Sequence, residues 1–537
     1  MLGKKSIAPE SASRVQRYSW YALAVLLIVY IINFIDRQIL AILAQDVKVD
    51  LRLDDAQLGF LYGTAFAVFY ALFGVPLGRL ADGWRRGTLI AIGLAFWSAM
   101  TVVSGFATSF AMLAIARMGV GIGEATAAPA SYSMLSDYFP PERRATAMSI
   151  YASGVYVGQG LSLPIGGFVL SRWKMAYPDA ALAPLGLAGW QAAFLAVGIP
   201  GLLVALWVLT LREPRRAAQP GSEQSDSKTN AWAMFCGELF AILPPLTLWS
   251  VSRYPGELAR NLMALVITAG LVAAMATATG DWAQWCAFGI GCYAVFSWVQ
   301  TLKYRDPATY RLIWGTPTVM GLLAGFGMMA FITYANTFWT PQYALRTFYE
   351  GPMASGAYFS TMTAAEEVAT ILGWGSAIAA AIGVIAGGVL ADRWRRRHPA
   401  GRVFVVMGAL LLSAPLVFAM YNTTSLSTFF ILALIAVMFG SSWSGAAVAT
   451  LQDIVLPRMR ATAGATFILA LTMVGLALGP YMVGKIATLS GNLRIGLSAL
   501  YLVAPLTLVV LWRCSKSIHQ TESTIAARAG EAGEAIS

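Results

Sequence analysis

Residues 78–86 read Gly-Arg-Leu-Ala-Asp-Gly-Trp-Arg-Arg, and residues 388–396 read Gly-Val-Leu-Ala-Asp-Arg-Trp-Arg-Arg. Each stretch is a short basic segment between two long apolar runs. A second pattern, Asp-x-x-x-Pro-x-x-Arg-Ala-Thr-Ala, begins at Asp137 and again at Asp453. Unrelated blocks would not share both patterns at matching places, so the sequence predicts two parallel structural repeats. Parallel repeats of this kind imply a central site between them, near the midplane of a membrane.

The composition excludes a soluble globular protein. Of the 537 residues, 58% are hydrophobic and only 12% are charged. Apolar runs long enough to cross a hydrocarbon core of about 30 Å recur along nearly the whole chain. The net charge of +11 comes from Lys and Arg gathered between these runs, which is typical of cytoplasmic loops and not of nucleic-acid binding. We therefore expect an all-α polytopic membrane protein, without a nucleic-acid partner.

The apolar runs predict fourteen spans, arranged as six, two and six, with both termini in the cytoplasm. Basic clusters at 253–260 and 303–311 flank the middle pair and should both be cytoplasmic, which two crossings satisfy and three do not. The segment 231–252 is accordingly expected to be interfacial or re-entrant. The expected organisation is a cytoplasmic tail (1–17), a first six-helix bundle (18–211), a linker with the interfacial segment and two extra spans (212–315), a second bundle (316–513) and a disordered cytoplasmic tail (514–537).

The sequence contains little that could support catalysis or metal binding. Its four cysteines are scattered without metal-ligand spacing, and its two histidines lie outside the expected spans. We expect no metal, no cofactor and no catalytic residues, and any proton carried through the membrane must ride on carboxylates. A membrane-embedded lipid-modifying enzyme, the distant alternative, would need a nucleophile, a metal cluster or a His-Asp pair near a membrane face.

Four charged residues lie deep inside the first and fourth apolar runs. Asp36 and Arg37 are adjacent in the first run, and Arg117 and Glu124 are two helical turns apart in the fourth. Each charge at a helix centre costs roughly 2.5–3.5 kcal/mol to insert, so such residues are candidates for a substrate or ion pathway. By rise per residue, Asp36 and Arg117 lie about 12 Å deep and Glu124 about 22 Å. A static, self-neutralising quartet is the alternative, but apolar packing could replace it, so we favour charges that exchange partners and protons.

The turn at 78–86 resembles the signature loop of the major facilitator superfamily. The resemblance implies two six-helix bundles that rock around a central cavity, here with two additional helices inserted between them. It also implies that charged residues of the loops lock neighbouring helices at the cytoplasmic side in one state of the cycle. The implied gate residues are Gly78, Asp82, Arg85, Arg86, Asp137, Arg144, Asp392 and Arg393.

Within that superfamily, Asn33-x-x-Asp36-Arg37 and Gly121-x-Gly123-Glu124-Ala125 resemble the spinster family, which includes proton-linked or facilitative carriers of lysophospholipids and sphingosine-phosphate-type lipids. The resemblance implies that Asp36 and Glu124 couple protons and that Arg37 meets an anionic headgroup. Arg117 is expected to relay charge or serve structure. The other expected substrate contacts are Asn33, Tyr156, Gln159, Tyr334 and Asn336.

The function expected from residues and resemblance together is proton-coupled secondary transport by alternating access. The expected cargo is an amphiphile of the lysophospholipid or sphingolipid kind, and a small organic anion or drug is the alternative. Symport and antiport stay open, because Leu163 stands where the antiporter-associated motif of the superfamily usually has Gly. We expect a monomer, surrounded by membrane lipids, in a bacterial inner membrane.

Overall fold

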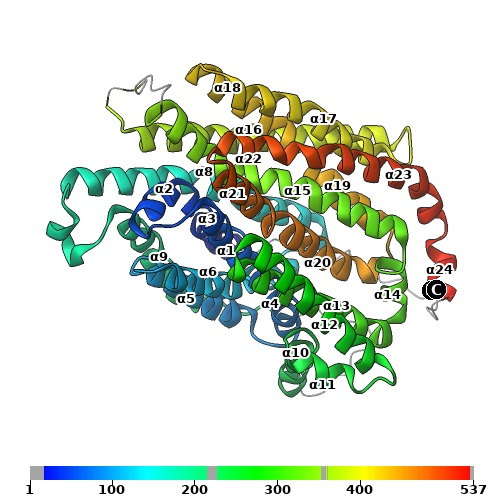
Figure 1. Ribbon diagram of the computed structural model, residues 1–537. Coiled ribbons are helices and arrows are strands. Elements are labelled where there is room, and N and C mark those ends of the chain that lie inside the picture. The colour runs from blue at the N-terminus through cyan, green and yellow to red at the C-terminus, as the bar shows by residue number, and fades with distance from the viewer. Residues whose placement is uncertain (1–16, 215–226, 352–358, 360, 532–537) are drawn as a thin grey trace, which may run out of the picture.

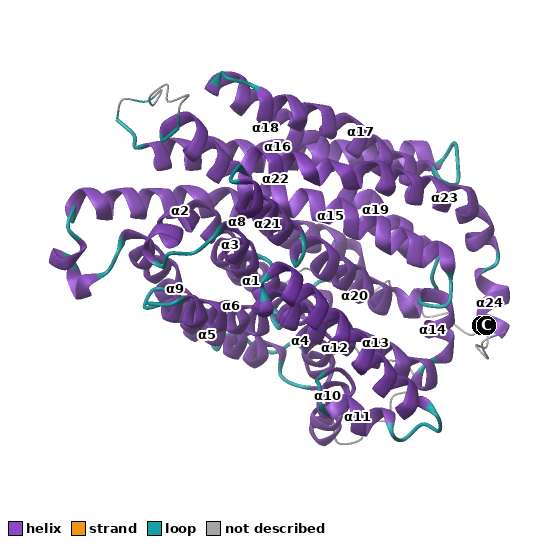
Figure 2. Ribbon diagram, viewed as in Figure 1, coloured by secondary structure: helices purple, strands orange, loops and turns teal. Residues whose placement is uncertain are grey.

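The computed structural model describes residues 17–214, 227–351, 359 and 361–531. Every regular element in these ranges is a helix, as Figure 2 shows by colour. Helices α5, α6 and α9 pack together in the first half of the chain, as do α16, α17 and α18 in the second half. The two halves meet where α8 packs on α16 and α3 packs on α21 (Figure 1). The all-α fold expected from the composition and the apolar runs is therefore confirmed.

Several membrane spans of the first half are divided by a break into two helices. The described residues of this half form nine α-helices. They are α1 (Arg17–Gln38), α2 (Leu40–Asp50), α3 (Asp55–Tyr62), α4 (Thr64–Gly83), α5 (Arg86–Ser104), α6 (Phe110–Glu124), α7 (Ala127–Tyr138), α8 (Pro141–Ala176) and α9 (Gly189–Val208).

The second half also contains an interrupted span, in which a π-helix separates two α-helices. Its elements are α15 (Pro317–Ala344), the π-helix η3 (Leu345–Tyr349), α16 (Ala364–Arg395), α17 (Gly401–Asn422), α18 (Leu426–Ser441), α19 (Trp443–Asp453), α20 (Arg460–Ala470), the π-helix η5 (Leu471–Leu476), α21 (Gly479–Ser490), α22 (Leu493–Ala499), α23 (Val503–Ser523) and α24 (Ile525–Glu531).

Five helices lie between the halves in sequence: α10 (Ser227–Ile242), α11 (Leu246–Val251), α12 (Glu257–Thr279), α13 (Trp282–Arg305) and α14 (Pro307–Ile313). We call α12 and α13 the inserted pair. At 16 residues, α10 is about 24 Å long and shorter than a typical span. It packs against α4, α11 and α13.

Thirteen helices in the described residues are long and apolar enough to cross a membrane. Helix α8, with 36 residues, is too polar to belong to that group, but it packs between α1 and α16. Counting it gives fourteen long helices, thirteen plus one, and that all fourteen cross the bilayer stays a prediction.

The molecule has two ends, which we name by their composition. The basic end carries the turns at 84–86 and 393–400 and the C-terminal helix α24, which lies beside α14 (Figure 1). The opposite end carries the connections at 51–54, 177–188 and 423–425. The distribution of Lys and Arg predicts that the basic end faces the cytoplasm.

The C-terminal tail differs from the expectation of disorder from residue 514 onward. Helix α23 continues to Ser523, and α24 folds back to Glu531. Arg528 donates to the hydroxyl of Thr316 (2.6 Å) and to the carbonyl of Thr521 (2.7 Å). These contacts hold the tail against the second bundle, which its polar composition did not indicate. Residues 532–537, and residues 1–16 of the expected tail at 1–17, lie outside the described residues.

One helix break of the first half lies directly against the second half. Gly63, between α3 and α4, lies so close to the backbone carbonyl of Leu476 that an added Cβ would clash with it. Only a residue without a side chain allows the two broken spans to approach this closely. The break at Ile39, between α1 and α2, comes directly after the charged pair Asp36-Arg37.

Candidate functional site

The centre of the molecule holds a buried ion pair between the two charged spans of the first half. Arg37, near the end of α1, donates to one carboxylate oxygen of Glu124 through Nη2 (2.6 Å) and through Nε (3.1 Å). The Glu124 side chain is fully buried, and that of Arg37 is 9% exposed. Asn33, one helical turn earlier, accepts from Arg37 Nη2 at 3.3 Å. The pair is thus hydrogen-bonded and almost completely removed from solvent.

Aromatic rings surround the guanidinium of Arg37. Its Cζ lies 4.7 Å from the ring centroid of Phe34, 4.6 Å from Phe66 and 5.1 Å from Tyr70. Ring faces attract a cation at these distances. Tyr334 of α15, in the second half, is half-buried. Arg37 is therefore a cation in an aromatic setting, with Glu124 as its counter-ion.

Arg117 has a different set of partners, all of them backbone carbonyls. Its guanidinium donates to Asp36 O (3.1 Å), Arg37 O (3.3 Å) and Leu61 O (3.4 Å). The helix breaks at Ile39 and Gly63 leave carbonyls in this region without their usual helical partners, and Arg117 satisfies them. The structure places Arg117 at the level of Asp36, as the spacing predicts. It binds the backbone there and not the carboxylate.

Asp36 is completely buried and points away from Arg37. Its Oδ2 accepts from Trp97 Nε1 at 3.0 Å, while Oδ1 has no hydrogen-bond partner in the described part of the chain. One oxygen of Glu124, Oε1, is likewise buried without such a partner. A buried ionised oxygen without a partner is unfavourable, and a proton on it removes the charge. Each of the two acids thus keeps one buried oxygen without a hydrogen-bond partner in the described residues.

The other expected substrate contacts are not gathered at this cluster. Asn336 donates to Tyr501 (3.2 Å) and accepts from Tyr421 (2.8 Å), so it is engaged within the second half. Tyr156 and Gln159 are half-buried on α8. Of the residues expected around the substrate, the structure joins Asn33 and Arg37 by a hydrogen bond.

At the basic end, the expected gate residues form ion pairs within each half. Arg86, the first residue of α5, pairs with Asp137 (2.6 Å) and Glu213 (2.8 Å). In the second half, Arg402 near the start of α17 pairs with Asp453 and with Asp392 (2.9 Å). Arg402 was not among the expected gate residues, although it lies at the start of α17, the helix of the second half that corresponds to α5.

The remaining expected gate residues are more accessible. Asp82, Arg85, Asp392 and Arg393 are exposed, whereas Gly78 and Arg144 are half-buried.

A further ion pair at this end links Asp306, before α14, to Arg458 at 3.1 Å. Partial burial acts to raise the pKa of Asp306. Hydrogen bonds from Arg458 and Thr309 outweigh it, so this pKa lies below its usual value.

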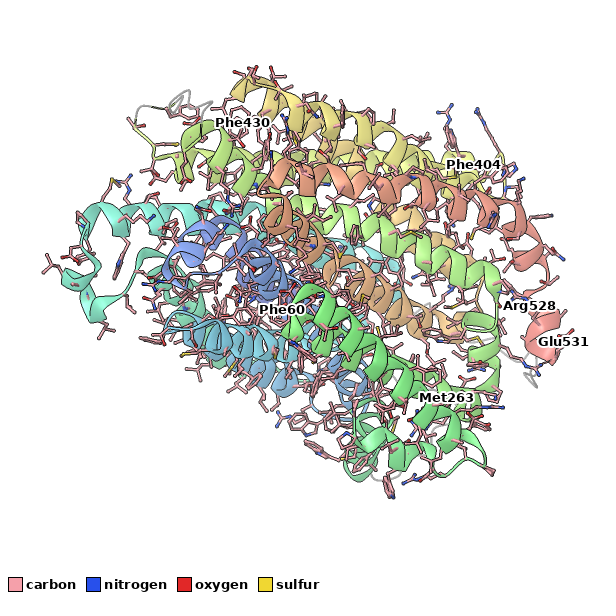
Figure 3. All side chains as sticks on the ribbon, viewed as in Figure 1. Phe60, Met263, Phe404, Phe430, Arg528 and Glu531 are labelled. Carbon is pink, nitrogen blue, oxygen red and sulfur yellow. The ribbon has the colours of Figure 1, made fainter. Side chains whose placement is uncertain are left out.

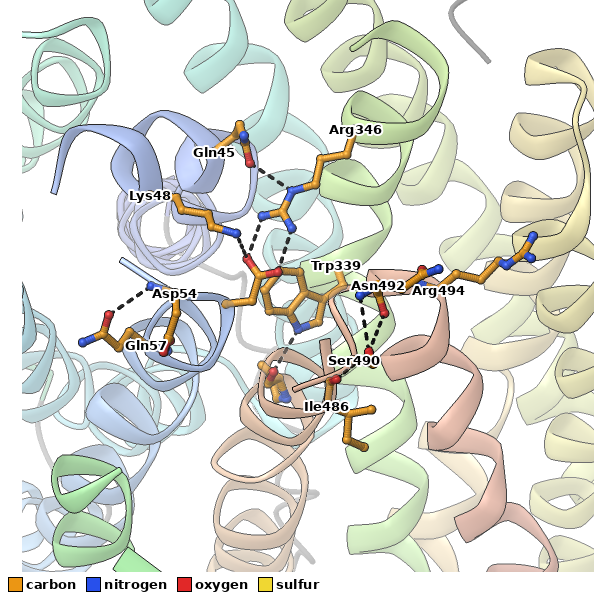
Figure 4. Close-up of polar contacts among 12 residues, drawn as sticks. Gln45, Lys48, Asp54, Gln57, Trp339, Arg346, Ile486, Ser490, Asn492 and Arg494 are labelled. Atoms are coloured by element: carbon orange, nitrogen blue, oxygen red, sulfur yellow. Dashed lines mark hydrogen bonds and ion pairs between the residues drawn. The ribbon is translucent and has the colours of Figure 1, made fainter. Parts of the chain in front are cut away.

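The opposite end has a polar lock that joins the two halves, which the sequence did not reveal. Arg346 of the second half donates to Gln45 and, with Lys48, meets the carboxylate of Asp55. Figure 4 labels Arg346, Gln45 and Lys48. The two bonds from Arg346 to Asp55 measure 2.8 and 2.9 Å, and the bond from Lys48 measures 2.7 Å. Gln342, one turn before Arg346, donates to Ala41 O at 2.5 Å. The two parallel bonds from Arg346 to Asp55 fix the relative orientation of these side chains as well as their separation.

The lock forms part of an open groove of about 770 Å³ at this end. The groove is lined by Asp55, by Arg346 and by the turn that contains Asn492. Arg346 and Asn492 are labelled in Figure 4. Because 291 residues separate Asp55 from Arg346, no local pattern could pair them. One property of the sequence pointed to Arg346: it is an arginine at the end of a span, on the side of the membrane where basic residues are scarce.

Similar known proteins are transporters. The sequence model described as Major Facilitator Superfamily matches residues 26–374. An MFS-type efflux pump of Mycolicibacterium smegmatis is 24% identical over 497 residues, which is 92% of this chain and 91% of that protein. Protein spinster homolog 1 of Xenopus laevis is 23% identical over 481 residues, 88% of this chain and 73% of that protein.

Two solved structures of a bacterial homolog to the human lysosomal transporter spinster are also similar. The inward-facing, occupied form has a TM-score of 0.63 and 25% identity, covering 96% of this chain and 97% of that one. The inward-facing, unoccupied form has a TM-score of 0.64 and 26% identity, covering 96% of both chains. A peptide transporter with a TM-score of 0.62 is only 14% identical and shares the fold.

Proposed function

Because the chain belongs to the Major Facilitator Superfamily, we propose that it is a proton-coupled carrier of an anionic amphiphile, working by alternating access in a bacterial inner membrane. The family and the thirteen apolar helices of the described residues make the chain a multi-pass integral membrane transporter, not an enzyme. To this the proposal adds that the coupling ion is a proton, that the cargo is an anionic amphiphile and that the membrane is a bacterial inner membrane.

The observation that carries the proposal is the Arg37–Glu124 pair beside a second buried acid. Arg117 is held by three backbone carbonyls, so Arg37 is the cation whose partner can change. An anionic group that binds Arg37 takes the place of Glu124. The carboxylate left behind is buried, and it becomes neutral by taking up a proton. Binding of the anion and binding of a proton are then the same event.

The surroundings of Arg37 favour an amphiphile. The rings of Phe34, Phe66 and Tyr70 line the guanidinium, and apolar and aromatic surfaces suit a hydrocarbon chain next to a charged head. The resemblance to the spinster family, repeated in the solved structures at 25% and 26% identity, supports a lipid-like cargo.

A small organic anion is the second candidate. A probable galactarate/D-glucarate transporter of Bacillus subtilis is 28% identical over 218 residues, 39% of this chain and 44% of that protein. A carboxylate would meet Arg37 as readily as a phosphate does. The two candidates differ in whether the aromatic lining contributes to affinity.

The test is substrate binding by the purified protein in lipid nanodiscs. A lysophospholipid and galactarate are compared at acidic and neutral pH, with thermal stabilisation as the readout. The amphiphile should stabilise the protein more, and Arg37→Ala should remove the effect. Arg513→Ala, an exposed arginine of α23, is the matched control. Stabilisation by the lysophospholipid that is unaffected by Arg37→Ala would contradict the proposal.

A further inference from the structure

The inserted pair, which the twelve-helix plan does not need, lies along one seam between the two halves. Helix α13 packs against α4 of the first half and against the π-helix η5 of the second (Figure 1). A separate apolar cluster fills this seam and draws on α4, α10, α13, α20 and η5; its buried members are Val68, Ala71, Leu72, Ala241, Ile242, Ala294, Trp298, Leu469 and Met473. The inserted pair is therefore in contact with both moving halves.

Helix α12 acts as an outer support for α13. Three of its residues are buried, Glu257, Asn261 and Ala276, and its outward face exposes apolar side chains such as Met263, labelled in Figure 3. Asn261 donates to Ser297 (2.9 Å) and Gln300 (2.8 Å) of α13. This buried polar network fixes α13 against α12, so the pair moves as one body.

The contact of the inserted pair with the first half is mainly apolar. Helix α10 packs on both α4 and α13, and Val68 and Leu72 of α4 are almost fully buried beneath them. Apolar contact of this kind is not broken by a change of charge. The inserted pair is accordingly attached to the first half.

The contact with the second half is apolar where α13 meets Met473 of η5, and it is polar at the opposite end. Asp281, before α13, accepts from Lys485 Nζ (2.8 Å) and Tyr481 Oη (2.8 Å), both on α21. Lys485 also donates to the carbonyl of Thr279. The side chains of Asp281 and Lys485 are 17% and 12% exposed, so the pair is shielded but not sealed from water.

This polar contact adjoins the lock between Asp55 and Arg346. Gly484, the neighbour of Lys485, lies against the backbone carbonyl of Asp55 so closely that an added Cβ would clash. Deeper in the seam, the hydroxyl of Thr64 lies 2.6 Å from Gln284 Oε1 of α13 and 2.6 Å from the carbonyl of Ala477. First half, second half and inserted pair thus meet around one short segment, α21.

We propose that the inserted pair is a latch: anchored on α4, it grips α21 through Asp281 and so stabilises the state that is closed at the opposite end. Opening that end moves α21 away from α3, and it must break the bonds of Asp281 as well as those of Asp55. The inserted pair thereby sets the balance between the two states of the cycle. The inference rests on the alternating access proposed above, and on no particular substrate.

The test measures the distance across the opposite end by pulsed electron paramagnetic resonance, without substrate. Spin labels are placed at Thr108 of the first half and Thr424 of the second, both exposed, in a chain whose four cysteines are replaced. Asp281→Asn keeps an acceptor for Tyr481 but loses the charge that holds Lys485. Asp281→Asn or Lys485→Met should raise the open population about three- to tenfold, as expected for a shielded ion pair.

The two substitutions together should have the effect of either one, and the swap Asp281→Lys with Lys485→Asp should restore closure. Asp179→Asn, an exposed acid at the same end, is the control and should change nothing. A distance distribution of Asp281→Asn equal to that of the control overturns the latch. The variant Asp55→Asn distinguishes failure of the latch from failure of alternating access. If Asp281→Asn has no effect but Asp55→Asn shifts the distance distribution, only the latch is refuted. If neither variant shifts the distribution, the latch and alternating access are both refuted.

Discussion

The substitution Glu124→Gln removes the charge that competes for Arg37 and leaves its shape in place. In the native protein at neutral pH, an anionic substrate must displace a carboxylate that bonds Arg37 at 2.6 and 3.1 Å. Glutamine offers one neutral oxygen, and the buried Arg37 is then without a counter-ion. We expect the variant to bind an anionic amphiphile more tightly at neutral pH than the native protein does.

The magnitude follows from the burial of the pair. Removing one partner of a buried ion pair costs about 3–5 kcal/mol, because the remaining charge is left uncompensated. The amide recovers part of that through one hydrogen bond of about 1–1.5 kcal/mol. An anion that restores the lost charge should gain back about 2–3.5 kcal/mol, which corresponds to binding roughly 30- to 400-fold tighter. The substrate-free variant should unfold at a lower temperature for the same reason.

The pH dependence is the sharper readout. In the native protein, affinity for the anion should rise as pH falls, because a proton on Glu124 releases Arg37. The Glu124→Gln variant has no such proton to take up, so its affinity should not change with pH through this group. Binding is measured on protein in nanodiscs with a labelled lysophospholipid at acidic and neutral pH. Glu142→Gln, an exposed glutamate at the start of α8, is the control for the substitution itself.

Two results would refute the reasoning. Weaker binding by Glu124→Gln at neutral pH would mean that the carboxylate assists the substrate and does not compete with it. A native affinity that is the same at both pH values would mean that the anion does not displace Glu124 at all. Either result would remove the link between the ion pair and proton uptake.

Three other substitutions test separate parts of the site. Asp36→Asn keeps an acceptor for Trp97 and should bind substrate normally but lose uptake driven by a pH gradient in liposomes; normal pH-driven uptake would exclude Asp36 from proton coupling. Arg117→Lys cannot reach three carbonyls with one ammonium group and should lower stability by about 2–4 kcal/mol, measured as thermal unfolding; an unchanged midpoint would contradict its structural role. Gly63→Ala should prevent the approach of α4 to Leu476 and weaken closure of the opposite end, measured with the same spin-label pair; an unchanged distance distribution would count against the close packing at Gly63.

Much of the fold could be predicted from the sequence, because repeated motifs and apolar runs are properties of the chain itself. The residues of the central cluster could also be found, since charges inside apolar runs stand out. Their partners could not. Which group Arg117 binds depends on where helices break, and the breaks at Ile39 and Gly63 arise from packing between distant segments. Trp97, the partner of Asp36, is one of 17 tryptophans and carries no local signal.

The contacts between the halves were the least predictable. Asp55 and Arg346 sit at the ends of spans, where each reads as an ordinary solvated charge. Only the folded chain brings them within 2.8 Å. Arg402 takes the position in the second half that Arg86 holds in the first, although a longer turn displaces it from the repeated motif.

The three carbonyls held by Arg117 join the chemistry of the centre to the seal at the opposite end. Two of them belong to Asp36 and Arg37, and the third belongs to Leu61 on α3. Helix α3 is eight residues long and begins with Asp55. One guanidinium therefore ties the backbone at Asp36 and Arg37 to the short helix α3, whose first residue, Asp55, forms the lock. About two turns of helix thus separate the central ion pair from the polar contact that joins the two halves at the opposite end.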